Sequence, residues 1–160
     1  MTTLVVLSGL PGSGKTTCAR QIQADARKRA GRPGTVVIVS RDALREHALG
    51  LTMIAGDQIL DRGGEAVVTA LESVMVEAAL VAPGVEMVVI DATHLTPKSV
   101  DRWRTVAARH DARVKVITLD APIEECIRRD AVRADGGGRY VGEDVIWSMA
   151  ARSTPTYGAI

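Results

Sequence analysis

The chain has 160 residues and a formal net charge of +1, with 46% hydrophobic and 24% charged side chains. This length suits one globular domain and is too short for two of ordinary size, so we predict a single domain over residues 1–160. The balanced charge excludes a protein that coats nucleic acid with a broadly basic surface. A polyanion would have to bind locally, where arginines cluster.

The first residues and the cysteines bear on the compartment of the protein. The stretch MTTLVV lacks the basic start and the cleavage site of a signal peptide. No apolar run approaches the roughly 20 residues that span a bilayer. Cys18 and Cys126 have neither CxxC spacing nor paired histidines, which argues against a zinc site or a disulfide framework. We therefore expect a cytoplasmic protein with no membrane and no disulfide partner.

Short runs rich in valine, leucine and isoleucine alternate with helical patterns along the chain. This alternation is typical of parallel strands joined by crossover helices, so the fold class is α/β. The predicted strands are Thr3–Ser8, Thr35–Ser40, Glu86–Ile90 and Val114–Leu119. The predicted helices, ended by glycine and proline signals, cover residues 15–31, 64–81, 97–110, 122–134 and 143–152.

The helix over residues 64–81 has an amphipathic pattern. Its predicted apolar face carries Val67, Leu71, Val74, Met75 and Ala78. The acidic side chains predicted to lie elsewhere on the helix are Glu65, Glu72 and Glu77.

Residues 9–16, GLPGSGKT, match the phosphate-binding pattern GxxxxGK[ST] between a valine-rich strand and a helix. Glycines let consecutive backbone N–H groups point at phosphate oxygens, and the helix N-terminus adds partial positive charge. Lys15 is predicted to reach the β- and γ-phosphates, and the Thr16 hydroxyl to ligate Mg²⁺. The predicted nucleotide contacts in the loop are Gly9, Pro11, Gly12, Ser13, Gly14, Lys15, Thr16 and Thr17.

Two of the predicted strands are followed by residues that suit an acceptor or a metal. After the second strand, Asp42 could accept a proton from an attacking hydroxyl, and Arg45 could bind an acceptor phosphate. The alternative is an N-cap aspartate and a solvated arginine. Asp91 ends the third strand, where it is predicted to join Thr16 at the metal, unless it only caps the next turn.

Arginines crowd the chain around a run of three glycines at 136–138. Arg128, Arg129 and Arg133 precede the run and Arg139 follows it. Arg129 and Arg133 share a helical face, so both could reach one anionic ligand. We predict a lid over about residues 128–141 that neutralises the transferring phosphate and excludes water. The alternative is a solvated basic face.

The ordered combination of these motifs resembles the kinase domain of the phage-type 5′-hydroxyl polynucleotide kinases, over nearly the whole chain. The matching pieces are GLPGSGKTT, SRDALR, VIDATHLTP, the arginines Arg129 and Arg133, and VGEDVIWSM. The resemblance implies a P-loop NTPase of the adenylate-kinase-like type, with about four parallel strands flanked by helices and an arginine-bearing lid. It also implies transfer of the γ-phosphate of ATP, with Mg²⁺, to the 5′-OH of a DNA or RNA end.

By that resemblance, Asp42 is the general base and Arg45 binds the phosphate of the acceptor's terminal nucleotide. The resemblance assigns the transferring phosphoryl group to Lys15, Arg129 and Arg133.

The family resemblance also assigns residues to the metal and to the acceptor. Thr16 and Asp91 lie near Mg²⁺, while Thr93 and Val141 belong to the acceptor site, with Val141 lining the pocket for the terminal base. The chain departs from the family pattern at His94 and in a longer glycine loop before Val141.

Two other functions fit the same motifs. A P-loop kinase of a small metabolite, a nucleoside or an aminoacyl-tRNA would share the phosphate loop and the lid. The low aromatic content of 2% favours it, because single-strand binders usually stack bases on aromatic platforms. A kinase that grips only the terminal nucleotides needs no such platform. A nucleotide-dependent switch with no acceptor is the third reading.

Overall fold

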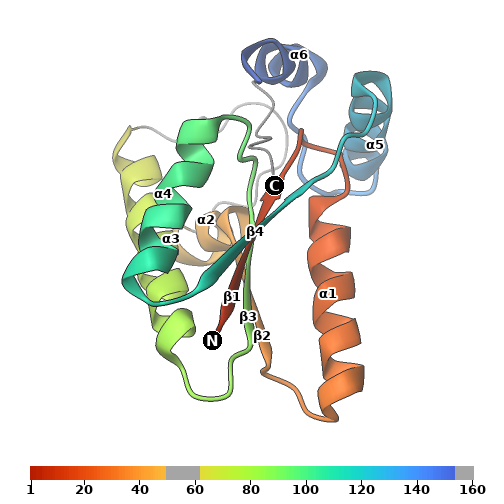
Figure 1. The fold of residues 1–160 in the computed structure, drawn as a ribbon. Coiled ribbons are helices and arrows are strands. Elements are labelled where there is room, and N and C mark those ends of the chain that lie inside the picture. The colour runs from red at the N-terminus through yellow and green to blue at the C-terminus, as the bar shows by residue number, and fades with distance from the viewer. Residues whose placement is uncertain (50–61, 154–160) are drawn as a thin grey trace.

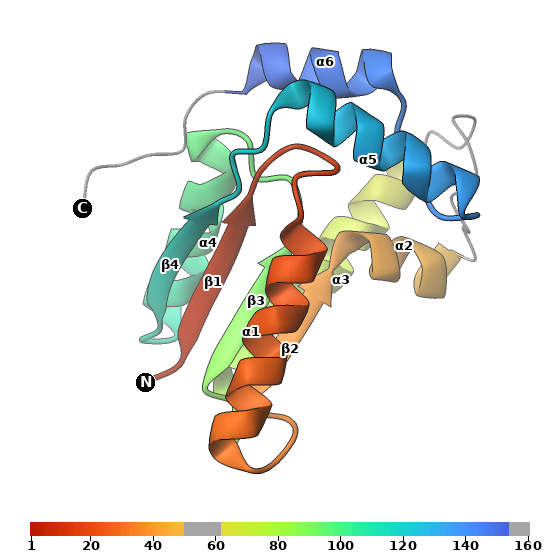
Figure 2. The ribbon, with the colours of Figure 1, turned by 90° about the vertical axis from the view of Figure 1, so that its right-hand side faces the viewer.

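In the computed structural model, a four-stranded parallel sheet runs through the middle of the molecule, with helices on both faces (Figures 1 and 2). The structure describes residues 1–49 and 62–153. The strands are β1 (Thr3–Ser8), β2 (Val36–Ser40), β3 (Met87–Asp91) and β4 (Arg113–Thr118). They lie in the order β2-β3-β1-β4, which confirms the predicted α/β fold.

The helices occupy three positions around the sheet (Figure 2). They are α1 (Lys15–Ala30), α2 (Arg41–Leu49), α3 (Arg62–Val81), α4 (Pro97–Arg109), α5 (Ile123–Asp135) and α6 (Glu143–Arg152). α1 covers one face of the sheet and α3 with α4 the other, while α5 and α6 lie beyond the carboxyl ends of the strands. Among the described residues, no helix combines the length and the apolar character needed to cross a membrane.

The central strand β1 is buried on both faces, as a strand in a parallel sheet must be. Its alternate residues Leu4 and Val6 pack toward α3 and α4, where Trp103 is the largest buried side chain. Val5 and Leu7 pack toward α1. One aliphatic core on each face of the sheet therefore holds β1 in place, and this fixes the position of the loop that follows β1.

The face by which α3 packs differs from the predicted one. Val67, Val74 and Met75 are exposed, Val74 to 66%. The buried residues of the helix are Val68, Glu72, Val76, Ala79 and Leu80. The prediction was wrong because α3 has apolar residues on most of its circumference, and an ion pair between Arg41 and Glu72 turns an acidic side chain inward.

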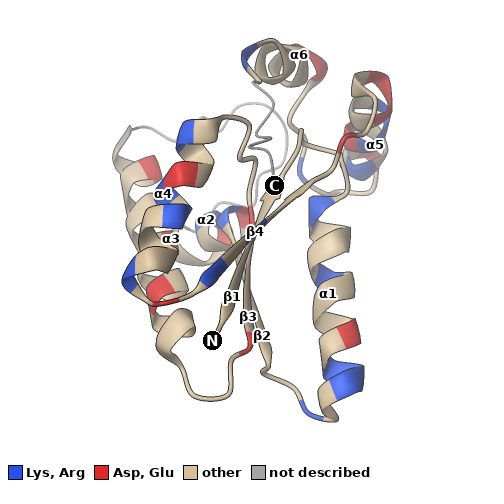
Figure 3. Cartoon of the chain, viewed as in Figure 1, with Lys and Arg blue, Asp and Glu red and all other residues tan. Residues whose placement is uncertain are grey.

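Charged residues of both signs lie on the helices that face the viewer in Figure 3. Lys and Arg are interspersed with Asp and Glu on α5, whereas α1 carries five basic residues and the single acidic residue Asp25. The mixed charges agree with the net charge of +1. What the protein binds must therefore depend on specific contacts at the strand ends.

Candidate active site

The candidate site lies where the strands end. The phosphate loop follows β1, Asp42 stands in the first turn of α2 after β2, and Asp91 ends β3. The carboxyl ends of parallel strands meet at one edge of the sheet, so these three segments converge beneath α5 (Figure 2). This edge is where open α/β sheets bind their ligands.

The phosphate loop requires its glycines for two reasons. Gly9, Gly12 and Gly14 have φ values of 151°, 82° and 99°, which side chains of L-residues rarely adopt. A Cβ at Gly9 would come within 2.7 Å of the Leu119 carbonyl oxygen, and a Cβ at Gly12 would overlap the carbonyl of Cys126. The loop is thus wrapped tightly between β1, the end of β4 and the start of α5.

Lys15 points into the loop that precedes it. Its Nζ donates to the carbonyl oxygens of Gly9 at 2.9 Å and Leu10 at 2.7 Å, and the residue is buried. Burial lowers the pKa of Lys15 to about 8, although the carboxylates of Asp91 and Asp42 oppose that shift. The ammonium group is therefore aimed at the loop interior and titrates close to neutral pH.

Thr16 and Asp91 form the pair of oxygen ligands predicted for a metal. Thr16 Oγ1 donates to Asp91 Oδ2 at 2.7 Å. Burial raises the pKa of Asp91, and the hydrogen bond from Thr16 partly offsets this. A hydroxyl and a carboxylate beside a phosphate loop fit Mg²⁺, which prefers oxygen ligands and completes its shell with phosphates and water.

On the predicted acceptor side, the structure brings Asp42 and Arg45 together. The Asp42 side chain is 52% exposed, and its Oδ1 accepts a hydrogen bond from Arg45 Nη1 at 2.8 Å. Glu65 of α3 holds the same guanidinium by two further bonds, at 2.9 Å to Nε and 3.1 Å to Nη2. Glu65 is absent from the predicted site, because a glutamate in the first turn of a helix is usually a solvated residue.

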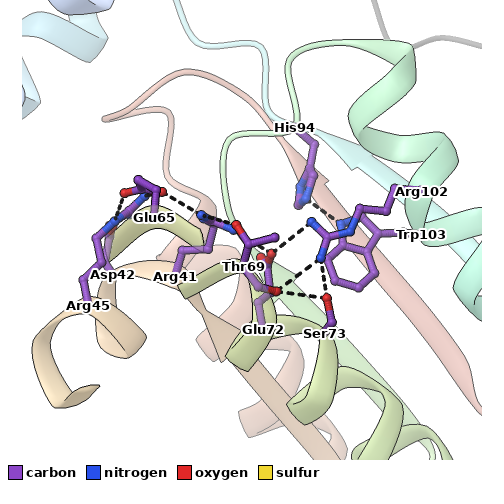
Figure 4. A network of polar contacts seen from close by, with 10 residues as sticks. All are labelled: Arg41, Asp42, Arg45, Glu65, Thr69, Glu72, Ser73, His94, Arg102 and Trp103. Carbon is purple, nitrogen blue, oxygen red and sulfur yellow. Dashed lines mark hydrogen bonds and ion pairs between the residues drawn. The ribbon is translucent and has the colours of Figure 1, made fainter. Parts of the chain in front are cut away.

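A chain of ion pairs extends from this pair into the core (Figure 4). Arg41 binds Glu65 and Glu72, each at 2.8 Å. Glu72 is only 1% exposed, and its Oε1 has no hydrogen-bond partner within the described residues. Arg102 approaches Glu72 at 3.6 Å and stacks on the ring of Trp103 at 4.5 Å. The network fastens α2, and with it Asp42, to α3 and α4.

His94 belongs to this framework and not to the reaction. Its Nδ1 donates to the Leu7 carbonyl at 2.9 Å, and its Nε2 accepts from Trp103 Nε1 at 2.8 Å. Burial lowers its pKa to about 4, so the ring is neutral. Both ring nitrogens are occupied, which leaves His94 to hold the loop after β3. The neighbouring Thr93, predicted at the acceptor, is exposed.

The two predicted lid arginines have different surroundings. Arg129 Nη1 donates to the Gly12 carbonyl at 3.3 Å and its Nε donates to Glu125 at 2.6 Å, so Arg129 lies against the phosphate loop. Its contact with a phosphate stays a prediction. Arg133 instead forms an ion pair with Asp130, a residue only 1% exposed. Its Nε donates to the Arg139 carbonyl at 2.7 Å. A phosphate contact for Arg133 stays a prediction.

Asp130 organises the loop between α5 and α6. Its Oδ2 accepts hydrogen bonds from the backbone N–H groups of Val141 and Gly142, both at 2.9 Å. Val141, predicted to line a base pocket, is half-buried there. At the same end of the loop, Arg139 forms an ion pair with Asp42 of α2. The lid segment thus reaches the acceptor side through Arg139.

The sequence matches the family described as "AAA domain" over residues 4–156. The chain belongs to this family. A search of curated proteins gave no match.

Solved structures place this AAA domain among the P-loop kinase folds. A chain of the Pnkp1/Rnl/Hen1 RNA repair complex has a TM-score of 0.74 and 25% identity, over 94% of this domain and 43% of that chain. The domain therefore spans less than half of that longer relative. Kti12 from Chaetomium thermophilum, in complex with ADP-AlF3, has a TM-score of 0.70 and 18% identity, over 94% of this domain and 79% of that chain.

A third structure shows that the fold also serves small acceptors. The Mycobacterium tuberculosis APS kinase CysC, in complex with AMPPNP and APS, has a TM-score of 0.60 and 21% identity, over 85% of this AAA domain and 75% of that chain. The P-loop kinase fold implied by the family resemblance is confirmed. Its acceptor must be argued from the site.

Proposed function

We propose that the chain transfers the γ-phosphate of ATP to the 5′-OH of a DNA or RNA end. The observation that carries this proposal is the Asp42–Arg45 pair, which Glu65 fixes at the strand edge that also bears the phosphate loop. The similarity to a chain of an RNA repair complex supports a nucleic-acid acceptor.

The donor side would bind the triphosphate through the loop amides and Lys15, with Arg129 lying on the loop. Thr16 and Asp91 would hold Mg²⁺, which neutralises charge on the β- and γ-phosphates when it is bound. Arg133 is bound to the buried Asp130 and to the Arg139 carbonyl, whereas Arg129 contacts the phosphate loop, so we assign Arg133 a smaller effect than Arg129.

On the acceptor side, Asp42 accepts the proton of the 5′-OH as its oxygen attacks the γ-phosphorus. The bond from that phosphorus to the β–γ bridging oxygen breaks, and ADP leaves. Arg45 uses three of the five N–H groups of a guanidinium on Asp42 and Glu65. The remaining two could bind the phosphate of the acceptor's terminal nucleotide. The family resemblance assigns Thr93 and Val141 to the same acceptor.

A small acceptor is the second candidate. Glu65 offsets the charge of Arg45, which lowers the attraction of this pocket for a strongly anionic chain. Few aromatic residues are available to stack bases: the chain has two tryptophans and two tyrosines, and of the tryptophans Trp103 is buried while Trp147 is exposed. A metabolite or nucleoside kinase would tolerate both features.

The test is incubation with γ-labelled ATP, Mg²⁺ and a 5′-OH oligonucleotide, as DNA and as RNA, beside the same strand carrying a 5′-phosphate. Label on the 5′-OH strand alone supports the proposal. Transfer to a small hydroxyl compound that excess oligonucleotide does not inhibit would support the metabolite kinase. ATP hydrolysis without transfer to any acceptor would favour a nucleotide-dependent switch.

A further inference from the structure

Arg139 lies between the donor and acceptor sides of the candidate site. It follows the glycine run of the lid segment and forms an ion pair with Asp42, the predicted base. Its charge also lowers the pKa of Lys15, whereas the charge of Asp42 raises it. Arg139 and Asp42 are therefore both close enough to act on the ammonium group in the phosphate loop. In the proposed function, a phosphoryl group in transfer from ATP to an acceptor would pass between these side chains.

The guanidinium of Arg139 has an N–H group that no acceptor within the described residues binds. Its Nε is buried and has no hydrogen-bond partner within residues 1–49 and 62–153. A buried N–H group without an acceptor is costly, and native structures rarely keep one unless something else binds it. An anion with several oxygens, seated beside Asp42, would supply the missing acceptor.

The backbone of the loop is fixed at this position although the loop is rich in glycine. Arg133 Nε donates to the Arg139 carbonyl, and Asp130 accepts from the N–H groups of Val141 and Gly142. Asp130 is itself buried and bound to Arg133. The pair Asp130–Arg133 thus holds the loop so that the Arg139 side chain points across to α2.

We propose that Arg139 is the arginine of the lid that contacts the transferring phosphoryl group, while Arg133 positions it. This assignment rests on the proposed phosphoryl transfer at this site. As the acceptor oxygen bonds to the γ-phosphorus and the bond to ADP breaks, negative charge spreads over the γ-phosphoryl oxygens. Arg139 donates to those oxygens, and Asp42, released from its ion pair, takes the proton of the hydroxyl.

The first test compares Arg139→Ala with Arg139→Lys and with Arg104→Ala. Arg104 is a matched control, because it pairs with Asp101 on the exposed surface of α4. We expect kcat for transfer to fall on the order of 100-fold in Arg139→Ala, with partial recovery in Arg139→Lys and little change in KM for ATP. Arg104→Ala should stay within about twofold of the unchanged protein. Transfer at the unchanged rate in Arg139→Ala would overturn the assignment.

The second test needs no acceptor and so separates this assignment from the proposed function. We would measure the affinity for ADP, with and without aluminium fluoride, in the presence of Mg²⁺. The fluoride complex mimics the transferring group, so the unchanged protein should bind it more tightly than ADP alone. Arg139→Ala should lose that gain and keep its ADP affinity. Retention of the gain in a folded Arg139→Ala protein, judged by its thermal unfolding, would mean that Arg139 only clamps Asp42.

A third variant, Arg133→Ala, distinguishes contact from positioning. If Arg133 acts by holding the loop, its removal weakens the fluoride complex less than removal of Arg139, and Arg133→Lys restores little because lysine cannot make both contacts. A larger loss in Arg133→Ala than in Arg139→Ala would return the phosphate contact to Arg133. If the protein does not phosphorylate a 5′-OH strand but Arg139→Ala still weakens the fluoride complex, the assignment of Arg139 stands and only the proposed acceptor is wrong.

Discussion

The donor and acceptor sides of the site are built in different ways. The phosphate loop takes its shape from consecutive residues, through glycines with positive φ and a lysine bound to carbonyls only five and six residues before it. The acceptor side depends on side chains that α2, α3 and α4 bring together. The shape of the phosphate loop should therefore depend mainly on its own residues and on the backbone packed against it, whereas the acceptor side should respond to substitutions far from the reacting atoms.

The largest expected effect is at Asp42. Asp42→Asn removes the proton acceptor but keeps the size of the side chain, so transfer should fall by about 1,000-fold. ATP affinity should change little, because a general base acts in the transition state. Transfer kinetics and equilibrium ATP binding check this. If ATP affinity fell as much as the transfer rate, Asp42 would belong to the donor side, and the proposed division of the site into two sides would be wrong.

A substitution at Glu72 tests whether the acceptor side depends on residues far from the reacting atoms. Glu72→Ala removes the buried one of the two carboxylates that bind Arg41 and opens space in the core, so the free energy of unfolding should fall by about 3 kcal/mol. The acceptor KM should rise while the KM for ATP stays constant, because α2 loses its anchor. Denaturant unfolding and steady-state kinetics measure the two effects.

Glu77→Ala is the matched control for Glu72, since Glu77 pairs with Arg109 and His110 near the surface of the same helix. Its removal should change the free energy of unfolding much less than removal of Glu72, because exposed ion pairs contribute little to stability. Equal losses from both substitutions would show that burial of Glu72 does not matter.

On the donor side, the lowered pKa of Lys15 predicts a pH dependence. Lys15 is charged below about pH 8 and loses its proton above it, so kcat/KM for ATP should decline above that pH, toward tenfold per unit. Bound triphosphate raises the pKa of the ammonium, so kcat itself should fall only at higher pH. A pH profile in which both parameters fall together would contradict this placement of the lysine.

The smallest expected effect concerns α3. Val74→Ser changes an exposed side chain and should alter the free energy of unfolding by less than about 0.5 kcal/mol. Val76→Ala, on the buried face, should cost about 2 kcal/mol. Denaturant unfolding of both variants shows which face of α3 packs against the core. A larger loss of stability in Val74→Ser than in Val76→Ala would favour the face predicted from periodicity.

These differences also explain what the sequence could predict. The strand ends, the phosphate loop and the Thr16–Asp91 pair follow from local patterns and from the rule that parallel strands end at one edge. The partnership of Arg45 with Glu65 and the burial of Glu72 depend on how α3 rotates about its axis, and a helix that is apolar on most sides does not reveal this.

The helix over the predicted lid arginines is confirmed, while the lid itself stays a prediction. Spacing along a helix cannot show that a buried carboxylate, Asp130, engages one of the two arginines. Arg139 belongs to an irregular segment without periodicity, so only the folded chain shows that it meets Asp42.

The tight contact of Gly12 with the backbone of Cys126 gives the protein a natural reporter. The Cys126 side chain is fully buried at the base of α5, and burial raises the pKa of its thiol, so it resists alkylation while α5 lies on the phosphate loop. Any movement that lifts α5 exposes this sulfur to solvent. The rate at which Cys126 reacts, compared with the partly exposed Cys18, therefore measures opening of the site without an added label.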